Sequence, residues 1–268
     1  MNTMIRCCIV MVVAAMGVPT AAAFCSSTCP TTSTSSLEVL RLGTSGGSCC
    51  DGVGGAETII LARRSSDNRV GACVLSGGNW TWRSLYDTSG SVITWTTMAK
   101  DASICAGAGN DIIRVQATSS SCNGTSIAAW SYSGYRLEMH GEGGADDMIG
   151  GPGSDRVCGG DDNDDISGGA GADDVDGLAG DDICEGGTGD LDTVWGASGR
   201  DYVLDVAGLN ETHRSESGAD HCLYDNDIHP DTNDVIDCGT DSDITGNCLG
   251  TPVVINGCET VCSSCWFY

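Results

Sequence analysis

Residues 141–204 repeat a nine-residue unit rich in glycine and aspartate: GEGGADDMI, GGPGSDRVC, GGDDNDDIS, GGAGADDVD, GLAGDDICE, the ten-residue GGTGDLDTVW and GASGRDYVL. Each unit follows the pattern G-G-x-G-x-D-x-U-x, in which U is a large apolar residue. Seven consecutive units keep this frame over about a quarter of the 268-residue chain. The repeat predicts a fold of stacked units, because neighbouring copies of one unit usually stack on one another.

The eighth position of the unit predicts a strand. One apolar residue in nine cannot make the stripe of an amphipathic helix, but in a short strand it can point inward while its neighbours point outward. A single unit cannot bury that residue alone, so we expect stacked, parallel strands about 4.8 Å apart. The residues at position 8 are Met148, Val157, Ile166, Val175, Cys184, Val194 and Val203.

The sixth position supplies a carboxylate, and the glycines around it permit a sharp turn with exposed carbonyls. Carboxylate and carbonyl oxygens are the ligands of Ca²⁺, whereas no thiolate or imidazole recurs at the period, which argues against zinc or copper. The predicted calcium-binding residues of these turns are Asp146, Asp155, Asp164, Asp173, Asp182, Asp192 and Asp201, with the glycines Gly141, Gly150, Gly159 and Gly168.

This segment resembles the calcium β-roll of the RTX family of secreted bacterial proteins. The resemblance implies an all-β, right-handed parallel β-roll, or β-solenoid, in which two units make one coil. It also implies that several Ca²⁺ ions lie between turns on the same side of consecutive coils. The implied pairs are Asp146 with Asp164, Asp155 with Asp173, Asp164 with Asp182, Asp173 with Asp192, and Asp182 with Asp201.

The departures from the family pattern are local. Glu142, Leu178 and Ala197 replace the second glycine of their units. The unit at 186–195 has one extra residue, so a calcium site that used Asp190 or Asp192 would differ most from the family pattern. Carboxylates stacked on every coil repel each other, so we expect Ca²⁺ to fold this segment and chelation to unfold it. A flexible, solvated acidic stretch is the alternative interpretation.

The same frame recurs outside the regular run. Residues 106–114, AGAGNDIIR, place Asp111 at position 6, which makes Asp111 a further predicted calcium ligand. Residues 52–60, GVGGAETII, place Glu57 there. We therefore expect residues 37–140 to form irregular coils built from degenerate repeats, beginning with a strand at 37–42.

Beyond Leu204 the frame weakens. Residues 205–231 show no repeat and are predicted as loop, whereas Asp234 and Asp243 return to register as further candidate metal positions. Residues 205–268 as a whole are predicted to form a cysteine-rich region with degenerate repeats and a cap. A cap is expected because an open coil end exposes strand edges.

The first 23 residues have one arginine, a short apolar run and three terminal alanines, which is typical of a secretory signal peptide cleaved after Ala23. A lipid anchor on Cys25 is the alternative. Residues 24–36 then read as a polar linker rich in Ser, Thr and Cys, and no later segment is long and apolar enough to span a membrane. These features predict a secreted, extracellular protein.

The charge and the cysteines agree with that location. The net charge is −25, so nucleic acid is excluded as a partner and cations are favoured. Seventeen cysteines predict several disulfides in an oxidising compartment, and the fifteen that follow the signal peptide leave one thiol free or bonded between chains. Their connectivity does not follow from their spacing.

Three sequence features bear on whether the protein is an enzyme. Residues 43–47 fit the G-x-S-x-G pattern of serine hydrolases, but glycines of the nine-residue frame follow where that motif needs a helix. His213 and His221 lie in the unframed segment and are predicted at the surface. None of the four histidines belongs to an H-E-x-x-H zinc motif: His140, His213, His221 and His229.

The tryptophans suggest a different class of function, because exposed indole rings on a solenoid can stack on sugars. Trp80 and Trp82 share one strand face, although burial in the N-terminal core is the favoured interpretation for these two. The candidates for such a platform are Trp80, Trp82, Trp95, Trp130 and Trp195.

The sequence thus predicts a secreted, non-catalytic protein that binds several Ca²⁺ ions, folds on extracellular calcium and has a structural or adhesive role. A cell-surface or matrix polysaccharide is the further partner to consider. The alternative is a secreted hydrolase or polysaccharide-active enzyme with an unrecognised site on the solenoid.

Overall fold

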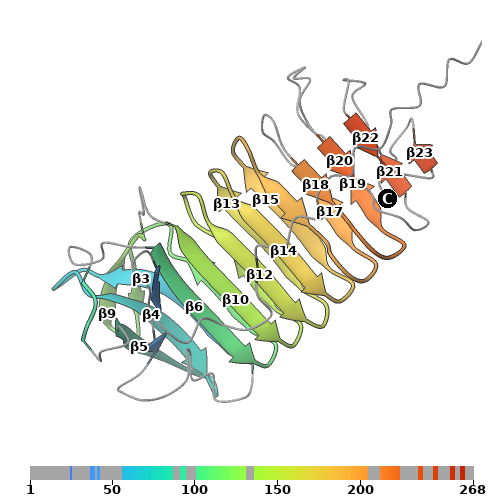
Figure 1. Ribbon diagram of the computed structural model, residues 1–268. Helices are drawn as coiled ribbons and strands as arrows, with labels where there is room; N and C mark the ends of the chain where they lie inside the picture. Colours follow the sequence, from blue (N-terminus) through green and yellow to red (C-terminus); the bar gives the residue numbers. More distant parts are fainter. Residues whose placement is uncertain are drawn as a thin grey trace, which may run out of the picture.

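The computed structural model describes residues 25, 37–39, 41–42, 56–86, 91–94, 101–130, 136–204, 212–223, 235–237, 244–246, 254–256 and 260–262. Every regular element in those ranges is a β-strand, and most of the strands pair in parallel (Figure 1). None of the described residues forms a helix that could cross a membrane. Several predictions lie outside these ranges: the signal peptide 1–23, the linker 24–36 apart from Cys25, the motif at 43–47, Trp95, Asp234 and Asp243.

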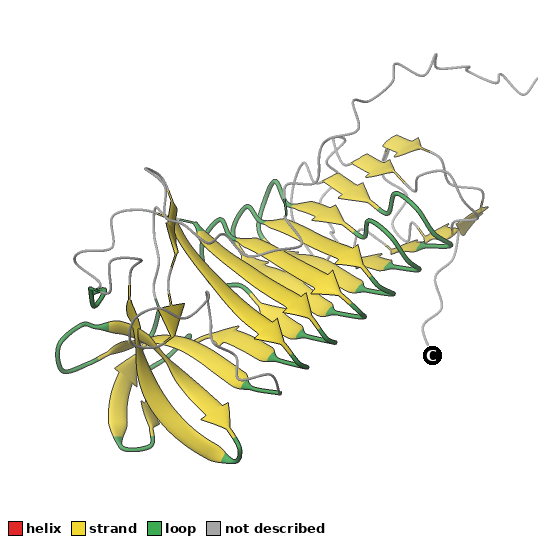
Figure 2. Ribbon diagram, turned by 60° about the horizontal axis from the view of Figure 1, so that its bottom comes forward, coloured by secondary structure: helices red, strands yellow, loops and turns green. Residues whose placement is uncertain are grey.

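From β10 onward the chain alternates between two sheets, called here the first and the second sheet. Consecutive strands of each sheet pair in parallel, as expected of a β-solenoid (Figures 1 and 2). The first sheet takes β10 (Leu137–Gly143), β12 (Arg156–Asp161), β14 (Asp174–Ala179), β16 (Thr193–Trp195), β18 (Thr212–Arg214), β20 (Val235–Asp237) and β22 (Val254–Asn256). The second sheet takes β11 (Asp147–Ile149), β13 (Asp165–Ala170), β15 (Ile183–Thr188), β17 (Tyr202–Leu204), β19 (His221–Leu223), β21 (Ile244–Gly246) and β23 (Thr260–Cys262).

The apolar residues at position 8 fix the register of both sheets. Met148 lies opposite Ile166, and Val157 lies opposite Val175, so each apolar side chain stacks on its equivalent one coil away. All seven residues of this set are at most 1 % exposed and belong to one continuous core. The prediction of an all-β fold with mainly parallel strands is confirmed.

The N-terminal coils keep the same frame where they are parallel. The first sheet begins with β1 (Leu37–Val39) and β6 (Asp101–Ala108), which pair with each other and lead to β10. The second sheet contains β3 (Thr58–Arg64) and β7 (Ile112–Val115), with Ile59 opposite Ile113. The end of the degenerate unit, residues 58–60, thus stands in register with residues 112–114.

Other strands of this region are antiparallel, unlike the predicted solenoid coils. β4 (Val70–Ser76) and β5 (Asn79–Tyr86) follow β3 as a meander, because Gly77 and Gly78, with φ of 57° and 81°, make a two-residue hairpin turn. β2 (Arg41–Leu42) pairs antiparallel with β5, so residues 37–42 form two strands of different sheets. β8 (Ser120–Cys122) and β9 (Thr125–Ala128) form a second hairpin.

The meander of β3, β4 and β5 is apolar on both faces. One face contributes Ile59, Leu61 and Val74 to the main core. The opposite face carries Ile60, Cys73, Trp80 and Trp82, which surround a second, smaller cluster with residues of the β8–β9 hairpin. In Figure 1 the labelled strands β3, β4, β5 and β9 lie at one end of the stack of parallel strands.

The segment that follows Leu204 contradicts its prediction as loop. β18 and β19 fall within it and pair in parallel with β16 and β17. Residues 215–223, SESGADHCL, form a degenerate unit with Asp220 at position 6. His213 occupies position 8 opposite Val194 and is 3 % exposed, so its prediction as a surface residue is also wrong.

The cysteines join distant segments. Disulfides link Cys25 to Cys158 and Cys73 to Cys122, with Cα atoms 5.8 and 5.6 Å apart. In this structure the first bond engages the sulfur of Cys25, which is the atom that the alternative lipid anchor would use. Cys184 is a buried free thiol that fills an apolar position of the core.

Candidate metal centre

The position 6 acids lie in two columns at the turns that precede the strands. The long column precedes strands of the second sheet, and the short column precedes strands of the first. Every member is buried, with at most 7 % of its surface exposed. The long column contains Glu57, Asp111, Asp146, Asp164, Asp182, Asp201 and Asp220, and the short column contains Asp155, Asp173 and Asp192.

One carboxylate oxygen of each aspartate joins its coil to the preceding one. The backbone N–H of Asp146 donates to Oδ1 of Asp164 at 2.8 Å, and the N–H of Asp164 donates to Oδ1 of Asp182 at 2.8 Å. The same bond recurs at 2.7–2.9 Å along both columns. The five pairs that the family resemblance implies are therefore neighbours on successive coils.

The second carboxylate oxygen has a different environment. Oδ2 is buried without a hydrogen-bond partner among the described residues in Asp111, Asp146, Asp164, Asp173, Asp182, Asp192 and Asp201. Only Asp155 differs among the predicted aspartates, because its Oδ2 accepts the N–H of Gly151 at 2.7 Å. Native proteins leave few buried polar atoms unpaired, so a repeated set of them needs an explanation.

The glycine at position 1 makes room for this oxygen. A methyl group on Gly168 would lie 2.7 Å from Oδ2 of Asp173 and 2.5 Å from the carbonyl oxygen of Gly186. Gly159 is crowded in the same way by Oδ2 of Asp164 and by a carbonyl of the next coil. A carboxylate oxygen and a carbonyl oxygen thus converge beside each of these glycines, and the predicted glycines Gly141 and Gly150 stand at equivalent places.

The units without a second glycine keep the turn. Glu142, Leu178 and Ala197 adopt φ of 74°, 74° and 72°, which is the left-handed region that glycine favours. Side chains in that region cost on the order of 1–3 kcal/mol unless the surroundings hold them there. The three departures therefore change the residue type and leave the local conformation of the turn in place.

The ten-residue unit accommodates its extra residue outside the column. Asp192 is 1 % exposed and accepts the N–H of Asp173 at 2.7 Å, whereas Asp190 is exposed. Leu191, with φ of 74° and 59 % of its surface exposed, takes the additional place in the turn. The column position belongs to Asp192.

Burial strongly favours the protonated form of these acids. It raises the pKa of Asp164 and Asp173 to about 8, and neighbouring carboxylates of the column act in the same direction. The donated backbone N–H groups oppose this effect without cancelling it. Burial also raises the pKa of Asp146 and Asp201 to about 7, that of Asp111 and Asp182 to about 6, and those of Asp155 and Asp192.

Each turn places few charged ligand side chains close to one possible metal position. The described part of the chain contains no group of three or more His, Cys, Asp or Glu side chains placed to hold a metal. A cation at a turn would take its remaining oxygens from backbone carbonyls and water, as Ca²⁺ commonly does.

Comparison with known proteins adds no assignment. No protein-family model, curated protein or solved structure matches this chain. The interpretation of the turns therefore rests on their own geometry.

Asp220 is the column member that the sequence analysis missed. It accepts the N–H of Asp201 at 2.9 Å and is fully buried. Its unit has Ser215 at position 1 and Glu216 at position 2, so the glycine signature is lost. The remaining signal was Gly218 followed two residues later by the acid, as in the preceding unit.

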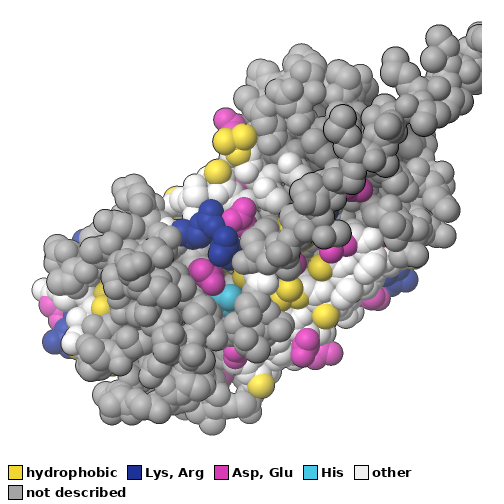
Figure 3. All heavy atoms as spheres, in the orientation of Figure 1, with side chains coloured by type: hydrophobic (Ala, Val, Ile, Leu, Met, Phe, Trp, Pro, Cys, Tyr) yellow, Lys and Arg dark blue, Asp and Glu magenta, His cyan; other side chains and the backbone are white. Residues whose placement is uncertain are grey.

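Other polar groups gather on the outer face of the first sheet, where Figure 3 shows basic side chains beside acidic ones and a histidine. Arg136 and Arg156 pair with Asp174 at 2.6 and 3.4 Å, and His140 contacts Glu138 at 2.8 Å. His140 is only 2 % exposed, so this network ties β10, β12 and β14 together and gives a substrate no access to the imidazole.

Proposed function

We propose that this chain is a secreted calcium-binding protein whose glycine and aspartate turns form a β-roll of the RTX type. The observation that supports this most directly is the set of seven aspartates whose second oxygen is buried without a partner among the described residues. A buried polar atom without a partner costs about 1–3 kcal/mol, and more when charged. A cation bound beside each carboxylate would remove that cost.

The donor atoms favour Ca²⁺ over other cations. Each turn presents carboxylate and carbonyl oxygens, which are hard ligands, and neither imidazole nor thiolate recurs there. When bound, Ca²⁺ would supply positive charge between two stacked turns. Column aspartates on successive coils, such as Asp164 and Asp182, would contribute the carboxylates, and backbone carbonyls and water would complete the shell.

The proposed role is structural or adhesive and does not include catalysis. Extracellular calcium modules bind at about 0.1–1 mM, so the columns would load and the coils would fold after export. The disulfides at Cys25–Cys158 and Cys73–Cys122 are compatible with that compartment. A protein that becomes rigid only outside the cell suits a surface or matrix component.

Replacement of Asp164 tests the proposal within one column. Asp164→Ala removes the carboxylate that two implied pairs share, so we expect it to bind up to two fewer Ca²⁺ ions per chain. It also leaves the N–H of Asp146 without its acceptor. In calcium buffer the unfolding free energy should fall by about 2–4 kcal/mol, as measured by denaturant titration.

Asp165→Ala is the matched control, because Asp165 is the next residue, carries the same charge and points to solvent. It should keep the wild-type calcium stoichiometry and change stability by less than about 0.5 kcal/mol. Equal stoichiometry and equal stability for the two variants would contradict the assignment of the column as the metal site.

A further inference from the structure

The β3–β5 meander leaves one of its faces partly uncovered. Ile60, Cys73 and Trp82 lie side by side on that face, because they oppose one another across the three strands. The β8–β9 hairpin lies over the face and is anchored by the Cys73–Cys122 disulfide. Trp80, two residues before Trp82, is only half-buried beside the hairpin.

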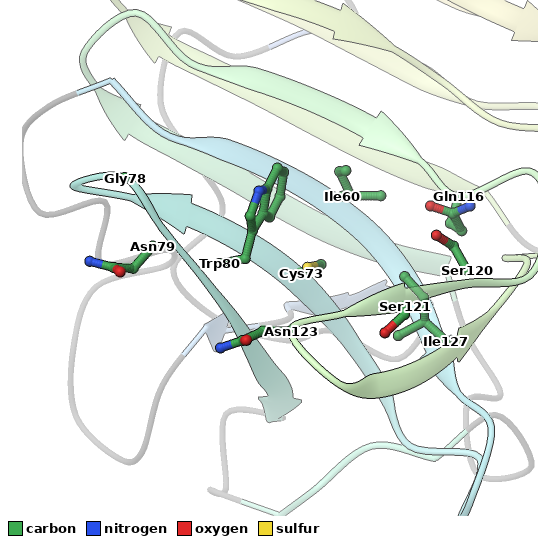
Figure 4. Close-up of a pocket in the computed structure, with 10 residues that line it drawn as sticks. All are labelled: Ile60, Cys73, Gly78, Asn79, Trp80, Gln116, Ser120, Ser121, Asn123 and Ile127. Atoms are coloured by element: carbon green, nitrogen blue, oxygen red, sulfur yellow. The ribbon is translucent and has the colours of Figure 1, made fainter.

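A cavity of about 480 Å³ lies between this face and the hairpin. Its volume falls within the range of about 300–1,000 Å³ that is usual for small-molecule sites. Figure 4 shows the apolar side chains of Ile60 and Trp80 from the sheet, with Gln116 on one side and Asn123 on the other, whereas the side chain of Asn79 points away from Trp80. Two serine hydroxyls of β8 complete the polar lining.

The cavity is neutral although the protein is strongly acidic. None of its ten lining residues is ionisable, since Cys73 is held in a disulfide, whereas the chain carries a net charge of −25. An anion would meet a repelling field and no counter-charge, and a cation would find no carboxylate in the cavity. The ligand that fits is therefore uncharged.

The lining also requires a ligand with two kinds of surface. A purely apolar ligand would bury amides and hydroxyls without partners, at about 1–3 kcal/mol for each. Asn and Gln amides both donate and accept, which suits hydroxyl groups, while an indole ring offers a flat apolar surface. The Nε2 of Gln116 already donates to the Thr118 carbonyl at 2.7 Å, which holds the amide in place.

We propose that this cavity binds an uncharged oligosaccharide. One sugar ring stacks on Trp80, and its hydroxyls bond to the amides of Gln116 and Asn123 and to the serine hydroxyls of β8. The site lies apart from both aspartate columns and shares no residue with them. Glycan binding at this site would give a secreted structural protein a defined partner. The proposal for the cavity does not depend on calcium binding by the columns.

The test is a calorimetric titration of the full secreted chain, in calcium buffer, with cellohexaose, xylohexaose, mannohexaose and chitohexaose. Hexagalacturonate serves as the charged comparison. The protein should come from a host without N-glycosylation, because Asn79 and Asn123 each begin an Asn-x-Thr sequence. We expect saturable binding of at least one neutral hexamer, with quenching of tryptophan fluorescence.

Three variants locate the binding. Trp80→Ala and Asn123→Gly should each raise the dissociation constant at least about tenfold, which corresponds to about 1.4 kcal/mol. Glycine suits the φ of 44° at Asn123, so the second variant removes the amide without strain and remains informative if Trp80→Ala misfolds. Thr81→Ala, on the opposite face of the same strand, should bind as the wild type does.

Several outcomes would overturn the proposal. These are no binding across the neutral panel, binding of hexagalacturonate alone, and equal affinity of the wild type and the Asn123→Gly variant. Loss of binding in Thr81→Ala to the same extent as in Trp80→Ala would also overturn it, because the effect would then be general to the strand.

Discussion

Chelation of calcium at about pH 8 is expected to abolish most of the β-sheet circular dichroism of this protein, and excess Ca²⁺ is expected to restore it. The physical reason is the stack of buried carboxylates, which carry like charges on successive coils once they ionise. One site loaded at one hundred times its dissociation constant adds about 2.7 kcal/mol of stability. A few such sites match the whole stability of a typical domain, about 5–15 kcal/mol.

Magnesium is the appropriate control for this experiment. Mg²⁺ has the same charge but prefers a small octahedral shell and loses its water reluctantly, so it should not restore the spectrum at equal concentration. An unchanged spectrum between chelator and calcium would show that the columns are stable without metal. Full recovery with Mg²⁺ would attribute the effect to general charge screening.

Protonation of the buried aspartates at acidic pH should stabilise the folded state in the absence of calcium. In the chelated protein we expect the β-sheet signal to be present at about pH 4.5 and to disappear as the pH rises to about 8. Burial raises the pKa of Asp164 and Asp173 to about 8 and that of Asp146 and Asp201 to about 7 in the folded state. The unfolded values lie near 3.9, so the folded state holds more protons between these limits.

The sign of the effect follows from that difference in bound protons. A carboxylate with a raised folded pKa contributes its full stability below the unfolded pKa and loses it as the pH rises through the folded pKa. The loss is about 1.4 kcal/mol per pH unit for each such group. In saturating Ca²⁺ the transition should weaken or vanish, because the metal favours the ionised form. Chelated protein with the same spectrum at both pH values would contradict this account.

Most of the fold of the regular repeats at 141–204 could be predicted from the sequence. A nine-residue period with one apolar residue requires stacking, so the burial and parallel register of Val157 and Val175 follow from the pattern alone. The place of Asp192 in its ten-residue unit did not follow. Either Asp190 or Asp192 satisfies the spacing, and the left-handed conformation at Leu191 decides between them.

Outside that run, local chemistry overrides the repeat. Ile59 stands in the predicted frame, but the paired glycines Gly77 and Gly78 turn the chain back on itself and produce antiparallel strands within the solenoid region. The inserted strands do not follow the nine-residue period, so the meander and its uncovered face at Trp80 could not be predicted from that period. The cavity beneath the β8–β9 hairpin depends on the Cys73–Cys122 bond, whose pairing the spacing left open.

The unit at 215–223 shows the opposite error. The loss of glycine at Ser215 and Glu216 removed the expected signature, yet the backbone at Glu216 still adopts a φ of 66°. Position 8 of this unit is Cys222, which lies opposite Val203, and the equivalent position of the preceding strand is His213, which lies opposite Val194. Neither residue is typical of a strongly apolar position. Once a solenoid is established, the neighbouring coil supplies the hydrogen bonds, so a unit can lose much of its own signal and stay in register.

A calorimetric titration of the full chain with Ca²⁺, after complete chelation and at about pH 8, is the decisive test of calcium binding by the aspartate columns. We expect saturable binding of several ions per chain, roughly one for each of the five implied aspartate pairs on successive coils. The β-sheet signal should grow in proportion to the bound metal. A titration without heat, or one that saturates without any gain in β-sheet structure, would show that the columns are not the calcium sites on which folding depends.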